Sequence, residues 1–376
     1  MKKALIIASV YGFIHHFERN DIKILQELGY EIIVASNFDN YKNELDNLNI
    51  SLIHIPFQRS PFSLKNIIAY KKLNEFLKKE KIDLIHCHTP IGGVVGRIAG
   101  YKNKVKNIIY TAHGFHFFKG ASLINWLLFY PVEKYLSKYT NILITINQED
   151  YKRAQNFYAE KVEYIPGVGL DTERIRNTEV DKKKKREELG LTEDNIVLLS
   201  VGELSKRKNH ITPIKALAQI KDNKNIFYLI AGVGPLEKYL KEECKRLGIE
   251  NQVKFLGFRK DVYELCKVSD IFVFPSLQEG LPVALMEALC CDLPIICSDI
   301  RGNRDLIENK KNGFLIKNNV EEYINKINFL LKDKFYEKLE VNNSEIIKKI
   351  DIKNIREKMR GFFSKNEKDR NIDGNI

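Results

Sequence analysis

The sequence has few cysteines for its length, and their spacing excludes most of the chemistry that cysteine supports. There are six in 376 residues, at positions 87, 244, 266, 290, 291 and 297. No two of them form the C-x-x-C pair that is typical of zinc sites. We therefore expect reduced thiols, as in a protein of the cytosol, and no disulfide framework.

Long hydrophobic runs are also missing. No segment approaches the roughly 20 consecutive apolar residues that span a bilayer, so we do not expect an integral membrane protein. Residues 1–10 resemble a signal peptide, but their apolar part is short and leads into Tyr11-Gly12-Phe13, a strand-to-loop pattern. We interpret this stretch as the first core strand.

Acidic residues are outnumbered by basic ones, which gives a formal net charge of +12. The excess is diffuse, and its one block, residues 182–186, is typical of a solvated helix start. No nucleic-acid-binding motif is present, and the basic residues do not interleave with aromatic residues along one face. We therefore expect no nucleic-acid partner. Anionic lipid and phosphorylated substrates are the partners that such a surface suits.

What the chain does contain is a regular alternation of apolar strands and amphipathic helices, which predicts doubly wound parallel sheets. The pattern restarts after a Pro/Gly hinge at 165–169. We predict an α/β protein with two such domains, residues 1–167 and 168–345, followed by a terminal helix that returns toward the first domain and a polar tail, residues 346–376. Ligands of open α/β sheets bind beyond the carboxyl ends of the strands. The predicted helices include 16–29, 41–48, 64–80, 91–101, 122–137 and 345–365.

Three loops that follow strands in the second half suit a nucleotide. Lys206-Arg207-Lys208 precede a helix, and cations at a helix N-terminus suit phosphate. Gly232-Val233-Gly234 allow the backbone to approach a ligand closely. At Phe258-Arg259 a planar base could lie against the turn. Each of the three could equally be an ordinary exposed loop.

The most informative stretch runs from Glu279 to Glu287, between two short apolar runs that predict buried parallel strands. Gly280 permits a sharp turn, and Pro282 suits the first turn of a helix. Glu287 is the one charge of this otherwise apolar helix, and a buried carboxylate needs partners. A ligand could be one of them.

Histidines follow two strands in the first half. His86 and His88 are two residues apart and therefore point to the same side of their strand. That spacing can bind metal, but we see no third ligand close by and expect no metal site. His113 ends the next strand, before Gly114, and should face the cleft. A structural histidine is the alternative.

Residues 115–130 are unusually aromatic for a segment outside a sheet and hold the only tryptophan. Helical spacing puts Trp126, Phe129 and Tyr130 on adjacent positions. With lysines at positions 119, 134 and 138, this segment could meet a bilayer interface. The alternative is that the aromatic residues belong to the domain core.

Together these motifs resemble those of the retaining glycosyltransferases of family 4, which have the GT-B fold of two facing Rossmann-like domains. The resemblance covers roughly residues 1–330 and is closest to capsular and exopolysaccharide glycosyltransferases of bacterial gene clusters. It rests on Glu279 and Glu287 with seven residues between them, on His113, and on residues 165–171, 231–235, 269–276 and 302–308.

The resemblance implies roles for the matching residues. Glu287 would accept hydrogen bonds from the ribose hydroxyls, and Glu279 would lie near the donor sugar and its phosphate. Lys208 would bind the diphosphate, and His113 would lie beside the 6-hydroxyl of the sugar. The amides of Gly280, Leu281 and Val283 would face the sugar or the diphosphate. The implied catalytic residues are His113, Glu279 and Lys208, and the implied donor-binding residues are Glu287, Arg207, Gly280, Leu281, Pro282, Val283, Gly232, Val233, Gly234, Phe258, Arg259 and Gly12, which occupies the first glycine loop of the family.

One position departs from the family pattern. The family usually has an arginine one residue after the strand-ending Gly202, and this chain has Glu203 there. A part of the expected diphosphate clamp is therefore replaced by an acidic residue. Arg207 is the candidate that would compensate for it.

The implied reaction is transfer of a hexose or N-acetylhexosamine, with retention, from a nucleotide diphosphate sugar to a polyprenyl-linked or other glycan acceptor. UDP-sugars are the default donors. No carboxylate is evident for a double displacement, so we expect front-face attack. No Asp-x-Asp motif is present, so we expect no obligatory metal or other cofactor. The first domain would bind the acceptor, in the cytoplasm or on the inner face of the plasma membrane.

Two alternatives stay open. A nucleotide-sugar epimerase of the same architecture would need extra carboxylates and histidines around the sugar, and the spacing of Glu279 and Glu287 favours transfer. A non-catalytic protein that binds sugar nucleotides or nucleic acid is suggested by the net charge alone. Replacing Glu287 and measuring both nucleotide affinity and transfer separates these cases.

Overall fold

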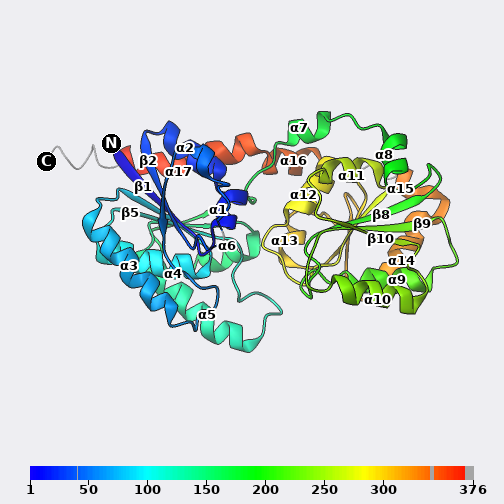
Figure 1. Cartoon of the computed structure of the whole chain (residues 1–376), viewed down its shortest axis with the longest axis horizontal. Coiled ribbons are helices and arrows are strands. Elements are labelled where there is room, and N and C mark those ends of the chain that lie inside the picture. Colours follow the sequence, from blue (N-terminus) through cyan, green and yellow to red (C-terminus); the bar gives the residue numbers. More distant parts are fainter. Residues whose placement is uncertain (40, 339–342, 369–376) are drawn as a thin grey trace. The chain divides into compact units, whose positions relative to one another are not determined.

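The computed structural model describes residues 1–39, 41–338 and 343–368. It contains two compact units. The first comprises Met1–Gly169 and the chain from Ile352 onward, and the second comprises Leu170–Asp351. Each unit is built on one sheet whose paired strands are all parallel (Figure 1).

The first unit has a seven-stranded sheet in the order β3-β2-β1-β4-β5-β6-β7. Its central strands are almost continuously apolar, because helices cover both faces of the sheet (Figure 1). The strands are β1 (Lys2–Ile7), β2 (Tyr30–Ser36), β3 (Ser51–His54), β4 (Leu84–His88), β5 (Asn107–Ala112), β6 (Ile142–Thr145) and β7 (Lys161–Tyr164). The helices are α1 (Tyr11–Phe17), α2 (Arg19–Glu27), α3 (Lys65–Lys79), α4 (Pro90–Lys102), α5 (Leu123–Leu136), α6 (Gln148–Ala154) and α17 (Ile352–Lys368), with 3-10 turns η1 (Asp46–Leu48) and η2 (Ser137–Tyr139).

The second unit has a six-stranded sheet in the order β10-β9-β8-β11-β12-β13. The apolar runs on both sides of the Glu279–Glu287 stretch are strands β11 and β12, which pair in parallel as predicted. The strands are β8 (Ile196–Val201), β9 (Ile226–Ala231), β10 (Val253–Gly257), β11 (Ile271–Phe274), β12 (Ile295–Ser298) and β13 (Phe314–Ile316). The helices are α7 (Thr172–Asn177), α8 (Lys182–Glu188), α9 (Ile211–Gln219), α10 (Glu237–Leu247), α11 (Val262–Val268), α12 (Val283–Cys290), α13 (Arg301–Arg304), α14 (Val320–Leu331), α15 (Phe335–Lys338) and α16 (Ser344–Ile350), with the 3-10 turn η3 (Lys332–Lys334).

Both strand orders create a point at which the chain switches from one half of the sheet to the other. In the first unit this point lies between β1 and β4, and in the second between β8 and β11. The loops that leave two such strands diverge to opposite faces and leave a crevice at the carboxyl edge. Among the candidate site residues, Arg207, Lys208 and Glu279 belong to the loops that follow β8 and β11 at the second of these points.

Helix α17 belongs to the first unit although it comes last in the chain. It packs on α2, where Arg356 forms an ion pair of 2.8 Å with Glu27. The sequence predicted a single helix over 345–365, but the structure has α16 and α17, separated at Asp351. The carboxylate of Asp351 accepts a hydrogen bond from the Thr172 hydroxyl, which fixes the chain at this break.

Two other helix predictions were wrong. The helix predicted over 16–29 is two helices, α1 and α2, with Glu18 between them. The helix predicted over 41–48 contains only the short turn η1, because Asn43 and Asn49 have positive φ angles of 62° and 50°. Asparagine tolerates this left-handed conformation, which ends a helix.

Among the described residues, no helix combines the length and the apolar character that crossing a membrane requires. All six cysteines are free thiols, and five of them are buried. The apolar start of the chain is β1, whose residues from Ala4 to Ile7 are fully buried. The interpretation of this stretch as a core strand is therefore confirmed.

Candidate functional site

In the second unit, the loops after β8 and β11 meet at the switch point of the sheet. The amide of Leu277 donates to the carbonyl of Arg207 over 2.8 Å. This backbone bond holds the basic loop against the loop that carries Glu279. The two stretches are more than 70 residues apart in the sequence, and the sheet topology brings them together.

A compact charge cluster occupies this meeting point. One carboxylate oxygen of Glu279, Oε1, lies 2.8 Å from Lys208 Nζ and 2.7 Å from Arg207 Nη1. Lys208 is largely buried, and its ammonium group lies 4.7 Å from the centre of the Phe274 ring. Burial lowers the pKa of Lys208, while the charge of Glu279 opposes this shift. Two cations sharing one carboxylate leave a net positive charge for an anionic ligand.

The residue that departs from the family pattern lies close to the same cluster. Glu203 is exposed, and its negative charge acts on Lys208. It adds an acidic group on the side of the loop where a second cation was expected. Arg207, 44% exposed in its side chain, supplies the second cation instead.

Glu287 is in the opposite electrostatic situation. It lies on α12, whose other residues from Leu285 to Cys290 are buried and apolar. Desolvation raises its pKa from 4.5 to about 7. Among the residues that the structure describes, none forms a hydrogen bond or ion pair with its carboxylate. A half-buried carboxylate in this condition is a candidate for contact with a ligand.

The turn before α12 presents backbone groups between the two glutamates. Pro282 is the N-cap residue of α12, so the amides around it have no acceptor inside the helix. Arg301 Nε donates to the carbonyl of Glu279 over 3.1 Å. A Cβ at Gly302 would lie 2.4 Å from the Gly280 carbonyl oxygen. The loop after β12 therefore holds the turn at Gly280, Leu281, Pro282 and Val283 in place.

The glycines after β9 are explained by contacts within the protein. A Cβ at Gly232 would lie 1.9 Å from the carbonyl oxygen of Gly202, and one at Gly234 would lie 2.6 Å from the backbone of Leu204. These glycines let the loops after β8 and β9 approach each other. Val233 between them is 51% exposed. Of these three residues, Val233 is the one whose side chain is open to a ligand.

Of the two residues that follow β10, Phe258 and Arg259, likewise only one is available to a ligand. Phe258 is 68% exposed, so its ring is available to a planar group. The guanidinium of Arg259 forms ion pairs with Asp261, at 2.5 Å, and with Glu188, at 3.3 Å. The structure therefore does not bring Arg259 together with the Lys208–Glu279 cluster, and its charge is already balanced within the protein.

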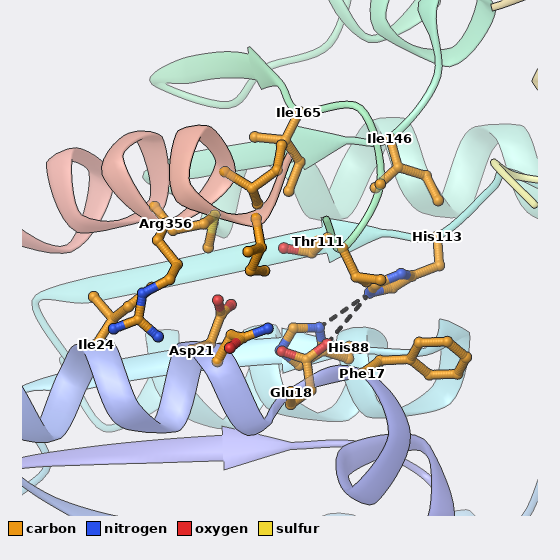
Figure 2. A pocket seen from close by; sticks show the side chains of 16 residues that line it. Phe17, Glu18, Asp21, Ile24, His88, Thr111, His113, Ile146, Ile165 and Arg356 are labelled. Atoms are coloured by element: carbon orange, nitrogen blue, oxygen red, sulfur yellow. Dashed lines mark hydrogen bonds and ion pairs between the residues drawn. The ribbon is translucent and has the colours of Figure 1, made fainter. Parts of the chain in front are cut away.

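In the first unit, three histidines and two carboxyl groups converge at the switch point. Figure 2 labels Glu18, Asp21, His88 and His113 of this group. His113 Nε2 lies 3.2 Å from His88 Nδ1. The other ring nitrogen of His88, Nε2, lies 3.1 Å from Glu18 Oε2. His88 and Glu18 are almost fully buried, whereas the His113 side chain is 19% exposed. We call Glu18, Asp21, His86, His88 and His113 the histidine–carboxyl cluster.

The remaining members of the cluster lie behind His88. His86 Nε2 bonds the Thr111 hydroxyl at 2.9 Å, and His86 Nδ1 lies 3.5 Å from Asp21. Burial lowers the pKa of His86 to about 3 and of His113 to about 4, and it lowers that of His88 as well. The histidines are therefore neutral at pH 7.

Burial shifts the pKa values of the carboxyl pair, Glu18 and Asp21, in the opposite direction. Burial raises the pKa of Glu18, and it raises that of Asp21 to about 7. The two side chains share a hydrogen bond, and Arg356 of α17 lowers the pKa of Asp21. The pair therefore retains a proton near neutral pH.

One premise about metal binding was wrong. The sequence showed no third ligand beside His86 and His88, but the fold places Glu18 there. Ligand atoms of all three lie within 4.8 Å of one another. Two histidines and a carboxylate are a donor set that divalent zinc accepts. This cluster is the group among the described residues that could hold a metal ion.

One further expectation about the first unit needs correction, and for the aromatic segment the alternative of a position in the core is confirmed. Gly12 lies in the first turn of helix α1 and not in a glycine loop, and no atom lies within 4 Å of its Cβ position. In the aromatic segment, Trp126, Phe129 and Tyr130 pack against the hydrophobic core. The exposed side of α5 is instead aliphatic, with Leu123, Ile124, Leu127, Leu128 and Val132.

Sequence reasoning missed two residues of the cluster, Glu18 and Asp21, and also Arg356, whose charge acts on Asp21. Glu18 and Asp21 are three residues apart in a stretch predicted as one ordinary amphipathic helix. Acidic residues on such a helix normally face solvent. The helix break at Glu18 turns its carboxylate inward, and no sequence pattern in the first half pointed to Arg356 in the terminal helix.

Comparison with known families decides between the functional classes. A family model described as "Glycosyl transferases group 1" matches residues 181–370, and one described as "Glycosyl transferase 4-like" matches residues 4–147. The chain belongs to this glycosyltransferase family. It is therefore a transferase, as its motifs predicted.

This glycosyltransferase is similar to several bacterial proteins. It is 38% identical over 322 residues to the putative glycosyltransferase EpsD of Bacillus subtilis, with 84% of each chain covered. It is 33% identical over 318 residues to UDP-Gal:alpha-D-GlcNAc-diphosphoundecaprenol alpha-1,3-galactosyltransferase of Escherichia coli, covering 81% of this chain and 79% of that one. Such similarity extends across both units.

Solved structures show the same GT-B fold. The crystal structure of Anabaena HepE in complex with UDP has a TM-score of 0.79 and 25% identity, and the match covers 97% of this chain and 100% of that one. The glycosyltransferase WaaG has a TM-score of 0.73 at 18% identity, a likeness that concerns the fold alone. The fold predicted from the sequence is confirmed.

Proposed function

We propose that this glycosyltransferase moves a hexose or N-acetylhexosamine from a UDP-sugar to a polyprenyl-diphosphate-linked glycan during synthesis of a surface polysaccharide. The relative from Escherichia coli carries UDP-galactose and a diphosphoundecaprenol acceptor in its name. A relative from Campylobacter jejuni, 28% identical, is named as an N-acetylgalactosaminyltransferase that acts on a diphospho-undecaprenol-linked sugar. These names support the chemistry of the donor and of the acceptor.

The observation that carries the proposal is Glu287. Its carboxylate is desolvated, and none of the described residues pairs with it. Two vicinal ribose hydroxyls are hydrogen-bond donors that one carboxylate can satisfy together. With Lys208 and Arg207 clustered beyond the start of α12, the order of groups is carboxylate, backbone amides, cations. A nucleotide sugar runs from ribose through diphosphate to sugar, so the carboxylate of Glu287 suits the ribose, and the amides and cations beyond it suit the diphosphate.

In this scheme the second unit binds the donor. The diphosphate displaces Glu279 from part of its contact with Lys208 and Arg207, which then stabilise the charge that develops on the leaving phosphate. Glu279 is released to accept hydrogen bonds from the sugar hydroxyls. Val233 and Phe258, both exposed, are placed to contact the sugar or the base.

The first unit, in the same scheme, binds the acceptor and contributes His113 to the donor sugar, beside its 6-hydroxyl. Attack takes place on the face from which UDP departs, so configuration is retained. The leaving phosphate oxygen accepts the proton of the acceptor hydroxyl. We propose no metal for this step, because Lys208 and Arg207 already provide positive charge.

We also propose that helix α5 rests on the cytoplasmic face of an anionic membrane. Its aliphatic residues recur at intervals of one, three and four, so they form one exposed stripe. Leu123 and Leu127 are 80% and 76% exposed. Lys119 and Lys138 are exposed near the two ends of the helix. An apolar stripe flanked by lysines suits the boundary between headgroups and acyl chains, where a polyprenyl acceptor is held.

The test uses purified protein, UDP-galactose, UDP-glucose and their N-acetyl derivatives, GDP- and ADP-sugars as controls, and a polyprenyl-diphosphate-linked GlcNAc. We expect UDP-sugars to raise the melting temperature and one of them to yield a lengthened lipid-linked product. Glu287→Ala should lose both effects. An epimerase would instead convert a UDP-sugar when no acceptor is present. Absence of any thermal shift with UDP-sugars would refute the proposal.

A further inference from the structure

In the second unit, the loop between β11 and α12 turns its carbonyl groups toward side chains of neighbouring segments. The carbonyl of Gln278 accepts a hydrogen bond from Arg207 Nη1 over 3.0 Å. The carbonyl of Glu279 accepts one from Arg301 Nε over 3.1 Å. The carbonyls at positions 275 and 276 are bound by the side chains of Asn209, Ser298 and Asn318. Side chains from three other segments therefore set the direction of the peptide groups in this loop.

The bond from Arg301 determines where the next amide points. A trans peptide places its C=O and N–H on opposite sides, so the N–H of Gly280 points away from Arg301. Arg301 follows β12, and β11 lies between β12 and β8 in the sheet. The side opposite to Arg301 is therefore that of the loop after β8, which carries Arg207 and Lys208. Among the described residues, no group accepts a hydrogen bond from the Gly280 amide.

Arg301 is itself held in one position. Its side chain belongs to α13, which starts directly after β12, and the residue is only 4% exposed. The Asn303 side chain donates to the carbonyl of Ser298 over 2.8 Å, which ties α13 to the end of the strand. A Cβ at Gly302 would lie 2.4 Å from the Gly280 carbonyl oxygen, so α13 packs directly against the turn. The direction of the Glu279 carbonyl is therefore set before a ligand binds.

We infer that Arg301 is a positioning residue that fixes the peptide between Glu279 and Gly280, so that the Gly280 amide donates to the diphosphate of the nucleotide sugar. This inference rests on the proposed function. In that scheme the diphosphate takes Arg207 from the Glu279 carboxylate. Arg207 holds the loop through the same Nη1 that binds this carboxylate, so its hold changes when the diphosphate arrives. Arg301 keeps the turn in place, and a pre-oriented amide stabilises leaving-group charge without reorganisation.

Two substitutions separate the hydrogen bond of Arg301 from its charge. In Arg301→Gln the amide nitrogen Nε2 is as many bonds from Cα as the Nε of arginine, so a donor remains at that place. In Arg301→Met a methyl group takes the place and the donor is gone. Both variants lose the guanidinium charge and the other contacts of the guanidinium. The difference between them therefore reports the bond to the Glu279 carbonyl.

The test is titration calorimetry with UDP and with uridine, together with single-turnover transfer. We expect Arg301→Met to bind UDP about tenfold more weakly than Arg301→Gln, as for one lost hydrogen bond, and its transfer rate to be lower by a similar factor. Uridine has no phosphate and its proposed contact is Glu287, so both variants should bind it equally. Equal UDP affinities in the two variants would overturn the inference. Equal weakening of UDP and uridine in Arg301→Met would show a merely structural role and overturn it as well.

The same short helix provides a control. Arg304 Nε pairs with Asp299 at 2.6 Å on the surface, so Arg304→Met should bind UDP like the wild type. If Arg301→Met does not fold, Arg301→Lys takes its place, because lysine keeps the charge and has a methylene group where arginine has Nε. Arg301→Lys should then bind UDP more weakly than Arg301→Gln and uridine equally well. Wild-type UDP affinity in Arg301→Lys would overturn the inference.

The outcomes distinguish this inference from the proposed function. If the wild type transfers sugar from a UDP-sugar but the Met and Gln variants bind UDP equally, the proposed function stands and the inference is wrong. If the two variants differ for UDP but not for uridine, and no sugar reaches a polyprenyl-linked acceptor, the role of Arg301 stands and the proposed reaction is wrong. Absence of UDP binding by the wild type would overturn both.

Discussion

Replacing Glu287 by glutamine should stabilise the free protein and weaken nucleotide binding. The isolated carboxylate has a pKa raised from 4.5 to about 7 by burial. Below pH 4.5 the carboxyl group is protonated in both the folded and the unfolded state, so it does not change the free energy of unfolding. Between pH 4.5 and 7 the unfolded chain ionises first, so the folded protein loses stability as the pH rises. Glutamine has no charge and avoids this loss.

The size of the effect follows from the two pKa values. At about 1.4 kcal/mol per pH unit, the difference between 4.5 and about 7 corresponds to roughly 3 kcal/mol above pH 7. From pH 5.5 to 8 the advantage of Glu287→Gln should therefore grow by about 2 kcal/mol. For a unit of this size that is about 4 to 8 °C in melting temperature. Loss of charge-assisted bonds to ribose should weaken UDP about 10- to 100-fold.

The assay is thermal unfolding of wild type and variant from pH 5.5 to 8, with and without UDP. Without UDP, Glu287→Gln should melt higher than wild type at pH 8, and its advantage should fall to about 1 kcal/mol at pH 5.5. With saturating UDP the advantage of the variant at pH 8 should shrink by about 1.4 to 2.7 kcal/mol. Glu242→Gln, an exposed site on α10, is the matched control and should show neither effect. A pH-independent difference, or unchanged UDP affinity, would refute the assignment of Glu287.

Four further outcomes test the rest of the site. Glu279→Gln frees Lys208 and Arg207, so UDP should bind several-fold tighter in titration calorimetry while transfer slows; weaker binding would contradict this. Lys208→Ala should lower kcat about 10²-fold in single-turnover assays, and a normal rate would exclude its phosphate role. Leu127→Glu should abolish co-sedimentation with anionic vesicles, whereas Leu52→Glu on edge strand β3 should not; equal retention would refute the membrane contact. Dialysis against EDTA should leave the transfer rate within about twofold, and a metal-restorable loss would refute the metal-independent scheme.

Much of the fold was accessible from the sequence because the sheets are parallel and buried. Strands covered on both faces have no polar side, so β1 and β11 appear as short, nearly unbroken apolar runs. The helices between these strands are amphipathic, so their sequences mix polar and apolar residues. The order of strands within each sheet carries no such local signature, and it followed from the family resemblance.

The donor half of the site could also be anticipated, since its signals are local. Glu287 is conspicuous as one charge in an apolar helix, and the cations at Arg207 and Lys208 are consecutive. What could not be seen was that Glu279 contacts both cations, because this contact joins loops from two strands. The same limit applies to Gly232, whose missing side chain makes room for the backbone at Gly202.

The acceptor half was harder because its polar groups are buried by tertiary structure. Glu18 breaks a helix that the pattern predicted to be continuous, and only this break directs its carboxylate to His88. The exposed aliphatic residues of α5 were not anticipated either. Trp126 and Tyr130 fill the core, so the aliphatic residues that usually mark a buried face are exposed instead. Aromatic bulk, and not hydrophobicity alone, decided which face was buried.

The two glutamates that frame the start of α12 show opposite solutions to the same electrostatic problem. In the free protein Glu279 balances Lys208 and Arg207, so two clustered cations do not lie uncompensated beside each other. Glu287 has no such partner among the described residues, and burial opposes its charge. A protein adapted for stability alone would have an apolar residue at position 287. The retained carboxylate is therefore best explained by a ligand that donates hydrogen bonds, and Glu279 by a ligand that takes over its cations.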